Sequence, residues 1–425
     1  MMQQKRLPLP TNTTSPCSTE EYRYIILGAG CAGLSLAWYM LEAGIKDSIL
    51  LLDQRREYKN DRTWCYWSVE PTPFDDLADF SWKSWEVFSD QSARAVSDSA
   101  CYPYLYLSSE QFYRRVQNRL RESPQVTLRL GQHVKGYEEV GGKVVVHTTD
   151  GSFSGRQLFN SVGGQPAKLP QSDEKPQWLQ HFHGQRIQTN RPVFNSNRLT
   201  LMDHRVSQKD GPHFIYLLPF SPTEALVENT YFFSTVVSPT RHRTEIADYL
   251  SRINNLKLWD YEVLDEEAGA IPMGRYETSN QHDGLIRSIG VISGAARPAT
   301  GYAFLRIQRQ CRQIAACLAA GKRVPVKTQA FGSRKYDLFD EIMLRVLRKS
   351  PQLAPAFFTA LFQGAPSDSV VRFLSERSSF ADDLWVIRSL LQPDFIRLLL
   401  SSAWGQLATL PAAIRTPPLP NAFPK

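Results

Sequence analysis

A glycine-rich turn follows an apolar segment at residues 22–27 and consists of Gly28-Ala29-Gly30-Cys31-Ala32-Gly33. The apolar residues after it recur at helical spacing, so this GxGxxG pattern stands between a predicted strand and a predicted helix. In that context the first glycine permits the tight turn, the second lets a pyrophosphate approach the backbone, and the third lets helix and strand pack closely. The free N–H groups at the helix start would face the phosphate charge. The turn therefore predicts a dinucleotide-binding α/β fold.

An acidic residue closes the second strand of the same unit. Gly44 ends the predicted helix, and the sequence SILLLD at 48–53 predicts a buried strand that finishes at Asp53. Asp53 follows Gly33 by about 20 residues, the spacing at which a carboxylate accepts hydrogen bonds from ribose hydroxyls. We expect the residues that contact the cofactor to be Gly28, Ala29, Gly30, Ala32, Gly33 and Asp53.

A second, distant segment favours FAD over NAD as the cofactor. Residues 290–304 return to a strand, then a turn with glycine and proline, then helical spacing. Flavoproteins that wrap one extended FAD use two such segments. A helix beginning near Tyr302 would direct its positive end at the flavin pyrimidine ring, where it stabilises the anion of a reduced flavin.

The composition and the order of segments predict several domains. The chain has 425 residues, of which 42% are hydrophobic and 21% charged, so extensive disorder is excluded and two or three domains are expected. We expect a flexible tail at 1–20, an FAD-binding Rossmann-like domain at 21–165 plus 285–330, a β-rich substrate-binding domain with an antiparallel sheet at 166–284, and a helical C-terminal region at 331–425. Within the first domain, strands at 126–130 and 143–148 are predicted to form a hairpin through Gly141-Gly142.

Metal and nucleic-acid binding are not indicated by the sequence. The six cysteines have neither a CxxC pair nor zinc spacing, and no known nucleic-acid module is present. His181 and His183 would share one face of a strand, but no third ligand accompanies them. No apolar stretch reaches the length of about 20 residues that spans a bilayer.

Five motifs occur in order along the chain: GAGCAGLSLA from Gly28, DRTWCYW at 61–67, LVENTYFF at 226–233, AGAIPMGR at 268–275 and ARPATGYAF at 296–304. Together they resemble the FAD-containing lycopene β-cyclases of carotenoid biosynthesis over residues 22–330. Many of these cyclases have a second acid after the strand glutamate, whereas Asn229 follows Glu228 here. Because side chains alternate along a strand, we expect Asn229 to face away from Glu228. The chain also lacks the Gly-Asp pair that flavin hydroxylases place on the ribityl chain, which counts against hydroxylation.

The resemblance implies that the linear ends of lycopene become β-ionone rings, giving γ- and β-carotene without net oxidation or reduction. Such a reaction needs a general acid in an apolar pocket, and Glu228 is the carboxylic residue on an otherwise apolar strand. Reduced FAD would stabilise the carbocation, and NAD(P)H would serve as the reductant. Arg62, Thr300, Gly301 and Tyr302 are expected to lie at the flavin.

Other interpretations of these features remain open. Glu228 could be an ordinary strand carboxylate, and the chain could be a reductase or hydroxylase of the same fold that acts on a polyisoprenoid. A non-catalytic flavin- and carotenoid-binding membrane protein is a third possibility. The sequence does not say whether one or both ends of the substrate are cyclised, nor which base removes the final proton.

Lycopene dissolves in bilayers, so the resemblance also implies a peripheral membrane protein, expected on the cytoplasmic side. Two groups of apolar residues in the C-terminal region could lie on the surface of a membrane or cap the protein core: Phe357, Phe358, Leu361 and Phe362, and Trp385, Ile387, Leu390 and Leu391. Residues 303–350 contain eleven Lys and Arg against three Asp and Glu, beginning with a stripe at Arg306, Arg309 and Arg312. This basic region, which runs on to Arg348 and Lys349, is predicted to form a docking face for an anionic membrane surface.

Overall fold

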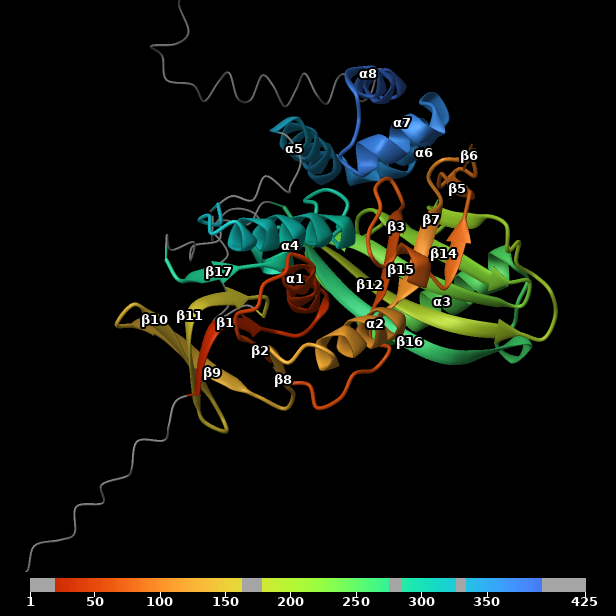
Figure 1. The fold of residues 1–425 in the computed structure, drawn as a ribbon. Coiled ribbons are helices and arrows are strands. Elements are labelled where there is room, and N and C mark those ends of the chain that lie inside the picture. Colours follow the sequence, from red (N-terminus) through yellow and green to blue (C-terminus); the bar gives the residue numbers. More distant parts are fainter. Residues whose placement is uncertain (1–19, 163–177, 275–283, 326–333, 392–425) are drawn as a thin grey trace, which may run out of the picture.

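The computed structural model describes residues 20–162, 178–274, 284–325 and 334–391. The tail at 1–19 and the segments 163–177, 275–283, 326–333 and 392–425 lie outside the described residues. The described chain forms two large sheets and one small one, with four helices gathered at the C-terminal end (Figure 1).

The first large sheet is the predicted dinucleotide-binding sheet. Its parallel part has the order β8-β2-β1-β11-β17, with β1 and β2 joined through helix α1. The strands are β1 (Glu20–Leu27), β2 (Ile49–Leu52), β8 (Val126–Arg129), β11 (Ser152–Asn160) and β17 (Ile286–Ser288), and α1 is Cys31–Glu42. The apolar runs of β1 and β2 are buried because helices cover the sheet. Helix α4 (Phe304–Ala319) packs beside α1.

The predicted hairpin in this sheet was wrong in one strand. The partner of β10 (Lys143–Thr148) through Gly141-Gly142 is β9 (Val134–Val140), and β8 instead pairs in parallel with β2. An apolar strand such as β8 could pair with β10 or with β2, and the sequence near β8 does not distinguish these two pairings.

The second large sheet is the expected antiparallel sheet, with the order β16-β12-β15-β14-β13-β5-β6. Its strands are β5 (Ser84–Phe88), β6 (Arg94–Asp98), β12 (Trp178–Thr189), β13 (Leu199–Asp203), β14 (His213–Ser221), β15 (Glu224–Phe233) and β16 (Tyr261–Met273). Strands β5 and β6 come from the segment that the sequence places in the cofactor domain, and β5 pairs in parallel with β13. Helix α3 (Pro239–Ile253) packs on one face of this sheet, against β12 and β15.

A small third sheet connects the two large ones. It contains β3 (Thr63–Trp67), β4 (Phe80–Trp82) and β7 (Tyr104–Ser108), and helix α2 (Ser109–Arg121) follows it. Short 3-10 turns occur at Asp75–Leu77, Leu258–Asp260, Gly290–Ser293 and Pro351–Leu353. The ring of Phe304, the first residue of α4, stacks on Tyr66 of β3 with ring centroids 4.7 Å apart. The small sheet therefore fixes where α4 begins.

The C-terminal helices lie together above the second sheet (Figure 1). They are α5 (Arg334–Lys349), α6 (Ala354–Gly364), α7 (Ser367–Leu374) and α8 (Phe380–Ser389). Residues Phe357, Phe358, Leu361 and Phe362 of α6 are buried in the core shared with the second sheet, so they cap the core and do not lie on the surface. Trp385, Ile387 and Leu391 are exposed.

The predicted basic stripe on α4 was wrong for two of its three arginines, whereas Arg312 is exposed, as are Arg348 and Lys349 at the end of the predicted face. Arg306 and Arg309 are buried, and both form ion pairs with Glu376, at 3.2 Å in each case. Arg309 also pairs with Glu70. Their charges are neutralised by acids far away in the sequence, so they form no docking face. No helix in the described part of the chain is long and apolar enough to cross a membrane.

Candidate active site

The β1–α1 turn has the geometry that a dinucleotide site requires. A Cβ on Gly33 would overlap the carbonyl oxygen of Gly28, and Gly28 itself has a φ of +88°, so both positions need glycine. Gly30 differs, because the nearest described atom to a Cβ there is Arg55 Nη2 at 3.8 Å. The space above Gly30 is therefore open to a phosphate group.

The start of α1 is free to bind an anion. Its first turn has no acidic residue, and no described side chain caps it. Asp53 is buried at the end of β2, where Oδ2 accepts the Ala29 N–H at 2.7 Å and Oδ1 accepts the Arg55 N–H at 2.8 Å. The acid thus holds the turn in place. Ala32 is buried against Gly290, so only its backbone could meet a cofactor.

One cavity of about 770 Å³ runs from this turn to the C-terminal helices. Gly30 and Arg62 line its cofactor end, and Ile387 and Leu391 of the α8 region line its other end. Ile387 and Leu391 are also 40% and 56% exposed, so this end of the cavity reaches the surface. The cavity therefore connects the dinucleotide turn with an apolar part of the surface.

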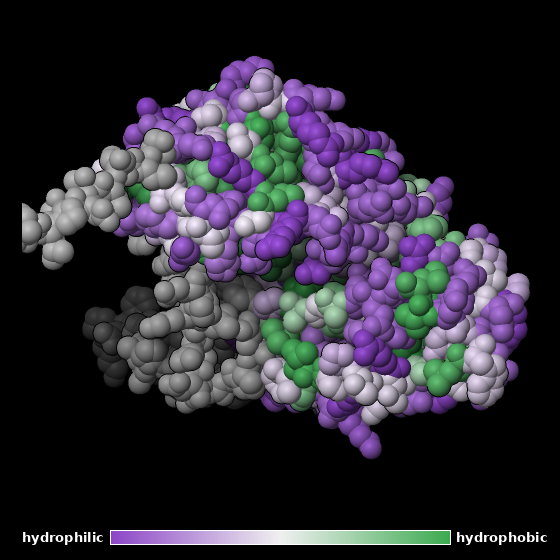
Figure 2. Space-filling model, turned by 90° about the horizontal axis from the view of Figure 1, so that it is seen from below, coloured by the Kyte–Doolittle hydropathy of each residue, from purple (hydrophilic) through white to green (hydrophobic). Residues whose placement is uncertain are grey.

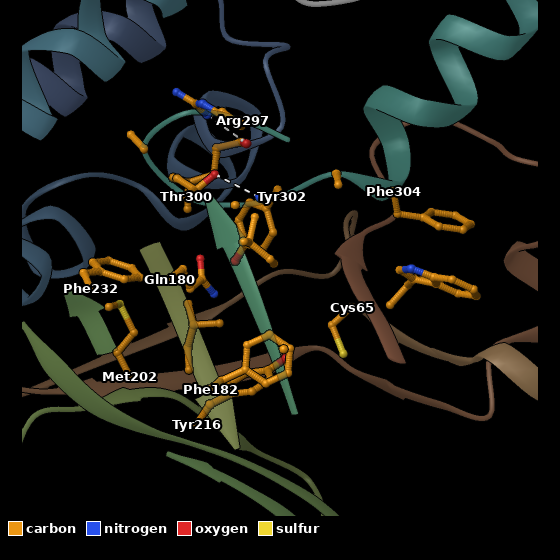
Figure 3. A pocket seen from close by; sticks show the side chains of 18 of the residues that line it. Cys65, Gln180, Phe182, Met202, Tyr216, Phe232, Arg297, Thr300, Tyr302 and Phe304 are labelled. Atoms are coloured by element: carbon orange, nitrogen blue, oxygen red, sulfur yellow. Dashed lines mark hydrogen bonds between the residues drawn. The ribbon is translucent and has the colours of Figure 1, made fainter. Parts of the chain in front are cut away.

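The loop before α4 lies against the second sheet inside this cavity (Figure 3). Gly301 has a φ of +70°, and a Cβ there would overlap the amide oxygen of Gln180 on β12. That oxygen is buried without a hydrogen-bond partner among the described residues. Thr300, Gly301 and Tyr302 all line the cavity, and α4 begins at Phe304, two residues after the predicted start near Tyr302. An unpaired carbonyl beside a glycine suits the polar edge of a flat ring such as flavin.

Glu228 lies in the same cavity, on β15. Its neighbours on the cavity wall are apolar or aromatic, including Leu226, Phe182 and Tyr216. Burial, together with the nearby negative charge of Glu267, raises the pKa of Glu228 to about 8, although Thr230 Oγ1 donates a hydrogen bond to its Oε1 at 3.1 Å. Glu228 therefore holds a proton at neutral pH and can donate it within an apolar pocket.

A second carboxyl group, Glu267 of β16, lies in the same cavity. Burial raises its pKa as well, while a hydrogen bond from Thr63 and the positive charge of Arg62 act in the opposite direction. Glu267 was not among the site residues predicted from the sequence. The signal that could have found it is its place immediately before the motif at 268–275.

A family model described as lycopene cyclase protein matches residues 24–396. The chain belongs to the lycopene cyclase family. A lycopene β-cyclase from Pantoea ananas is 24% identical over 388 residues, which cover 86% of this chain and 94% of that protein.

Solved structures share the fold at low identity. A geranylgeranyl bacteriochlorophyll reductase-like protein from Thermoplasma acidophilum has a TM-score of 0.60 at 11% identity and covers 90% of this chain and 99% of its own. A flavoprotein/dehydrogenase from Cytophaga hutchinsonii has a TM-score of 0.59 at 13% identity, with 91% and 100% covered. The fold expected from the sequence is therefore confirmed as one found in flavoproteins.

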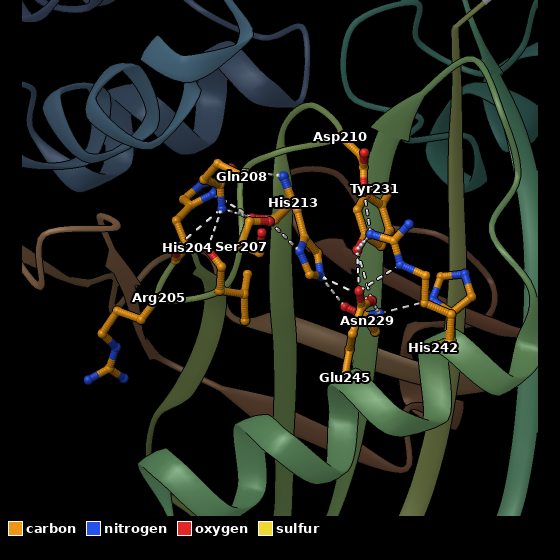
Figure 4. Close-up of polar contacts among 12 residues, drawn as sticks. His204, Arg205, Ser207, Gln208, Asp210, His213, Asn229, Tyr231, His242 and Glu245 are labelled. Atoms are coloured by element: carbon orange, nitrogen blue, oxygen red, sulfur yellow. Dashed lines mark hydrogen bonds and ion pairs between the residues drawn. The ribbon is translucent and has the colours of Figure 1, made fainter.

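The second acid of many lycopene cyclases is replaced here by Asn229, which faces away from the cavity. Figure 4 shows Asn229 among polar side chains on the α3 side of the sheet, where its Nδ2 donates to Glu245 at 2.8 Å and its Oδ1 bonds to His213. The alternation of side chains along β15 predicted this separation from Glu228. A change at position 229 therefore need not alter the acid in the cavity.

His181 and His183 lie on the same face as Asn229, as their spacing predicted, because His183 pairs directly with Asn229 across β12 and β15. Within the described ranges, no group of three or more His, Cys, Asp or Glu is arranged to hold a metal ion.

Proposed function

We propose that this chain converts the linear ends of lycopene into β-ionone rings by a non-redox, acid–base intramolecular cyclisation that yields γ- and β-carotene. The observation that carries the proposal is Glu228, a carboxyl group whose raised pKa keeps it protonated in an apolar cavity. Membership of the lycopene cyclase family supports the choice of substrate.

The reaction begins with a proton from Glu228 to the CH carbon of the terminal double bond, which leaves a cation on the dimethyl carbon. The electrons of the next trisubstituted double bond then close a six-membered ring. Aromatic residues such as Phe182 and Tyr216 line this part of the cavity and exclude water, which would otherwise trap the cation as an alcohol.

The residues present fit an FAD cofactor. Gly28, Ala29, Gly30, Ala32, Gly33 and Asp53 would hold the dinucleotide, and Arg62, Thr300, Gly301 and Tyr302 line the cavity or the loop where the flavin would lie. In its reduced form the bound cofactor supplies negative charge that stabilises a nearby cation, and NAD(P)H would provide the electrons for that reduction.

Expression in lycopene-producing cells tests the proposal. Chromatography and mass spectrometry should show cyclic products with the mass of lycopene, and Glu228→Gln should abolish them while FAD stays bound. A gain of hydrogen would indicate a reductase and a gain of oxygen a hydroxylase. Unaltered lycopene with bound FAD would contradict the proposal and favour a non-catalytic carotenoid-binding protein.

We further propose that the protein binds the cytoplasmic surface of the membrane through α8. This helix directs polar residues inward, since Asp382 pairs with Arg372 and Asp383 with Lys335, while Phe380 and Leu384 are exposed. The face seen in Figure 2, from below relative to Figure 1, is mainly hydrophilic with separate small apolar patches. Binding through an apolar helix face predicts attachment to vesicles of neutral phospholipid that high salt does not remove.

A further inference from the structure

We propose that Glu267 is the catalytic base that removes the final proton from the new ring, with Glu228 as the acid that starts the reaction. The inference rests on the proposed cyclase function. It is carried by the position of the two carboxyl groups in the sheet.

Glu228 and Glu267 lie in one row across three adjacent strands. Gly184 of β12 is paired with Glu228 of β15 on one side and with Glu267 of β16 on the other. Residues paired in this way direct their side chains to the same face of a sheet. Both acids therefore face the cavity, which they both line.

Gly184 places no side chain between the two acids, and Leu226 Cδ1 borders the same space, 3.1 Å from where a Cβ of residue 184 would lie. A Cβ at this position would lie 3.6 Å from Glu228 Cγ and 3.2 Å from Glu267 Cγ. The two side chains thus lean toward the same point from opposite sides. A substrate end placed above Gly184 would have one carboxyl group on each side.

The surroundings assign different protonation states to the two acids. The positive charge of Arg62 acts to lower the pKa of Glu267, whereas the negative charge of Glu267 raises the pKa of Glu228, so the ionised form is favoured at Glu267. Two acids that repel each other in a buried site hold one proton between them, and Glu228 retains it. The pair therefore offers a proton donor and a proton acceptor at the same time.

The step balances in protons and electrons. Glu228 loses a proton to the terminal double bond, and ring closure leaves a cation on the methyl-bearing ring carbon. Glu267 takes the proton from the adjacent, newly bonded ring carbon, whose C–H electrons become the ring double bond conjugated with the polyene. Transfer of that proton from Glu267 back to Glu228 restores the starting state.

Glu266 provides a matched control on the opposite face of β16. Its carboxylate accepts a hydrogen bond from Gln185 at 2.7 Å and pairs with Arg243 at 2.6 Å, away from the cavity. Glu266→Gln makes the same chemical change as Glu267→Gln at the adjacent position and leaves the proposed base in place.

The experiment compares the wild type, Glu266→Gln and Glu267→Gln in lycopene-producing cells and as purified proteins with FAD. Glu266→Gln should retain FAD and wild-type ring composition. Glu267→Gln should retain FAD but form β-rings about 100-fold more slowly, as for loss of a general base. Its residual product should include rings whose double bond lies elsewhere, because the cation then loses a proton to a different acceptor.

The readouts separate failure of this inference from failure of the proposed function. A wild type that forms no rings would overturn both. A wild type that forms β-rings, with Glu267→Gln equal to it in rate and ring composition, would overturn the role of Glu267 alone. If Glu267→Gln does not retain FAD, Glu267→Met replaces it, because it also lacks a proton acceptor, and wild-type rate and ring composition in that variant would count against the role.

Discussion

Arg297 and Asp340 form a buried ion pair between the loop that precedes α4 and helix α5, with Nη2 and Oδ1 2.9 Å apart. Arg297 also donates hydrogen bonds from Nη1 to the backbone carbonyls of Phe373 and Leu374, at 2.9 Å each. The loop that carries Thr300 to Tyr302 is therefore anchored to the C-terminal helices. The Arg297 side chain therefore joins the loop at the cofactor end of the cavity to the C-terminal helices.

Asp340→Asn should lower the free energy of unfolding by about 3 kcal/mol, because it leaves the Arg297 charge buried without a counter-ion. Urea unfolding followed by circular dichroism measures this. Glu341→Gln on the same helix is the control, since it breaks only the exposed pair with Arg345 and should change stability by less than about 0.5 kcal/mol. Equal effects of the two substitutions would contradict the prediction.

Substitutions at two glycines of the β1–α1 turn should separate folding from cofactor binding. Gly33→Ala should prevent correct folding, because its Cβ would overlap the Gly28 carbonyl oxygen. Gly30→Ala should fold, since the free space around a Cβ there extends to 3.8 Å, but should bind FAD at least 10-fold more weakly by blocking the phosphate. Flavin absorbance measures FAD binding, and thermal unfolding measures whether each variant folds. A Gly30→Ala protein with wild-type FAD affinity would show that no phosphate lies above this residue.

Cyclisation should slow as pH rises through about 8, because Glu228 must be protonated to act and its pKa is about 8. The free energy of unfolding should also depend on the protonation of Glu228. The folded protein binds it more tightly than the unfolded chain, whose glutamate has the ordinary value of 4.5, so the free energy of unfolding should fall between about pH 4.5 and 8. Urea unfolding across this range should show a decline that Glu228→Gln reduces. An unchanged decline in the variant would assign the proton to another group.

The double substitution Phe380→Ser and Leu384→Ser should reduce vesicle binding at least 10-fold, because it removes exposed apolar area from α8. Co-sedimentation with neutral phospholipid vesicles measures it. Leu258→Ser with Trp259→Ser is the control, since these residues are also strongly exposed, at 71% and 79%, but lie in the 3-10 turn before β16. If the control lost binding and the α8 variant kept it, the membrane surface would have to be placed near that turn.

Local patterns were predicted correctly from the sequence, and long-range pairing was not. The GxGxxG turn and the direction of Asn229 away from Glu228 depend on neighbours within one or two elements, which periodicity reveals. Glu267 could not be found in this way, because its place beside Glu228 depends on the register of three strands. Gly184 pairs with Glu228 on one side and with Glu267 on the other.

The buried arginines of α4 show the same limit. Arg306 and Arg309 looked like a surface stripe because their partners Glu70 and Glu376 are far away along the chain. Strands β5 and β6 likewise lie in the second sheet because β13 offers them a free edge, which composition near 84–98 does not encode.

Helix α8 turns its acidic side chains toward the protein and apolar side chains toward solvent, and this arrangement also governs how the isolated protein behaves in solution. Its two aspartates pair with Arg372 and Lys335, while Phe380, Leu384 and Leu391 are exposed to solvent. An uncovered apolar patch favours contact with a second copy of itself when no lipid is present. Purification without detergent should therefore give a mixture of aggregates that a mild detergent disperses, and the measured catalytic rate will depend on the amphiphile chosen for the buffer.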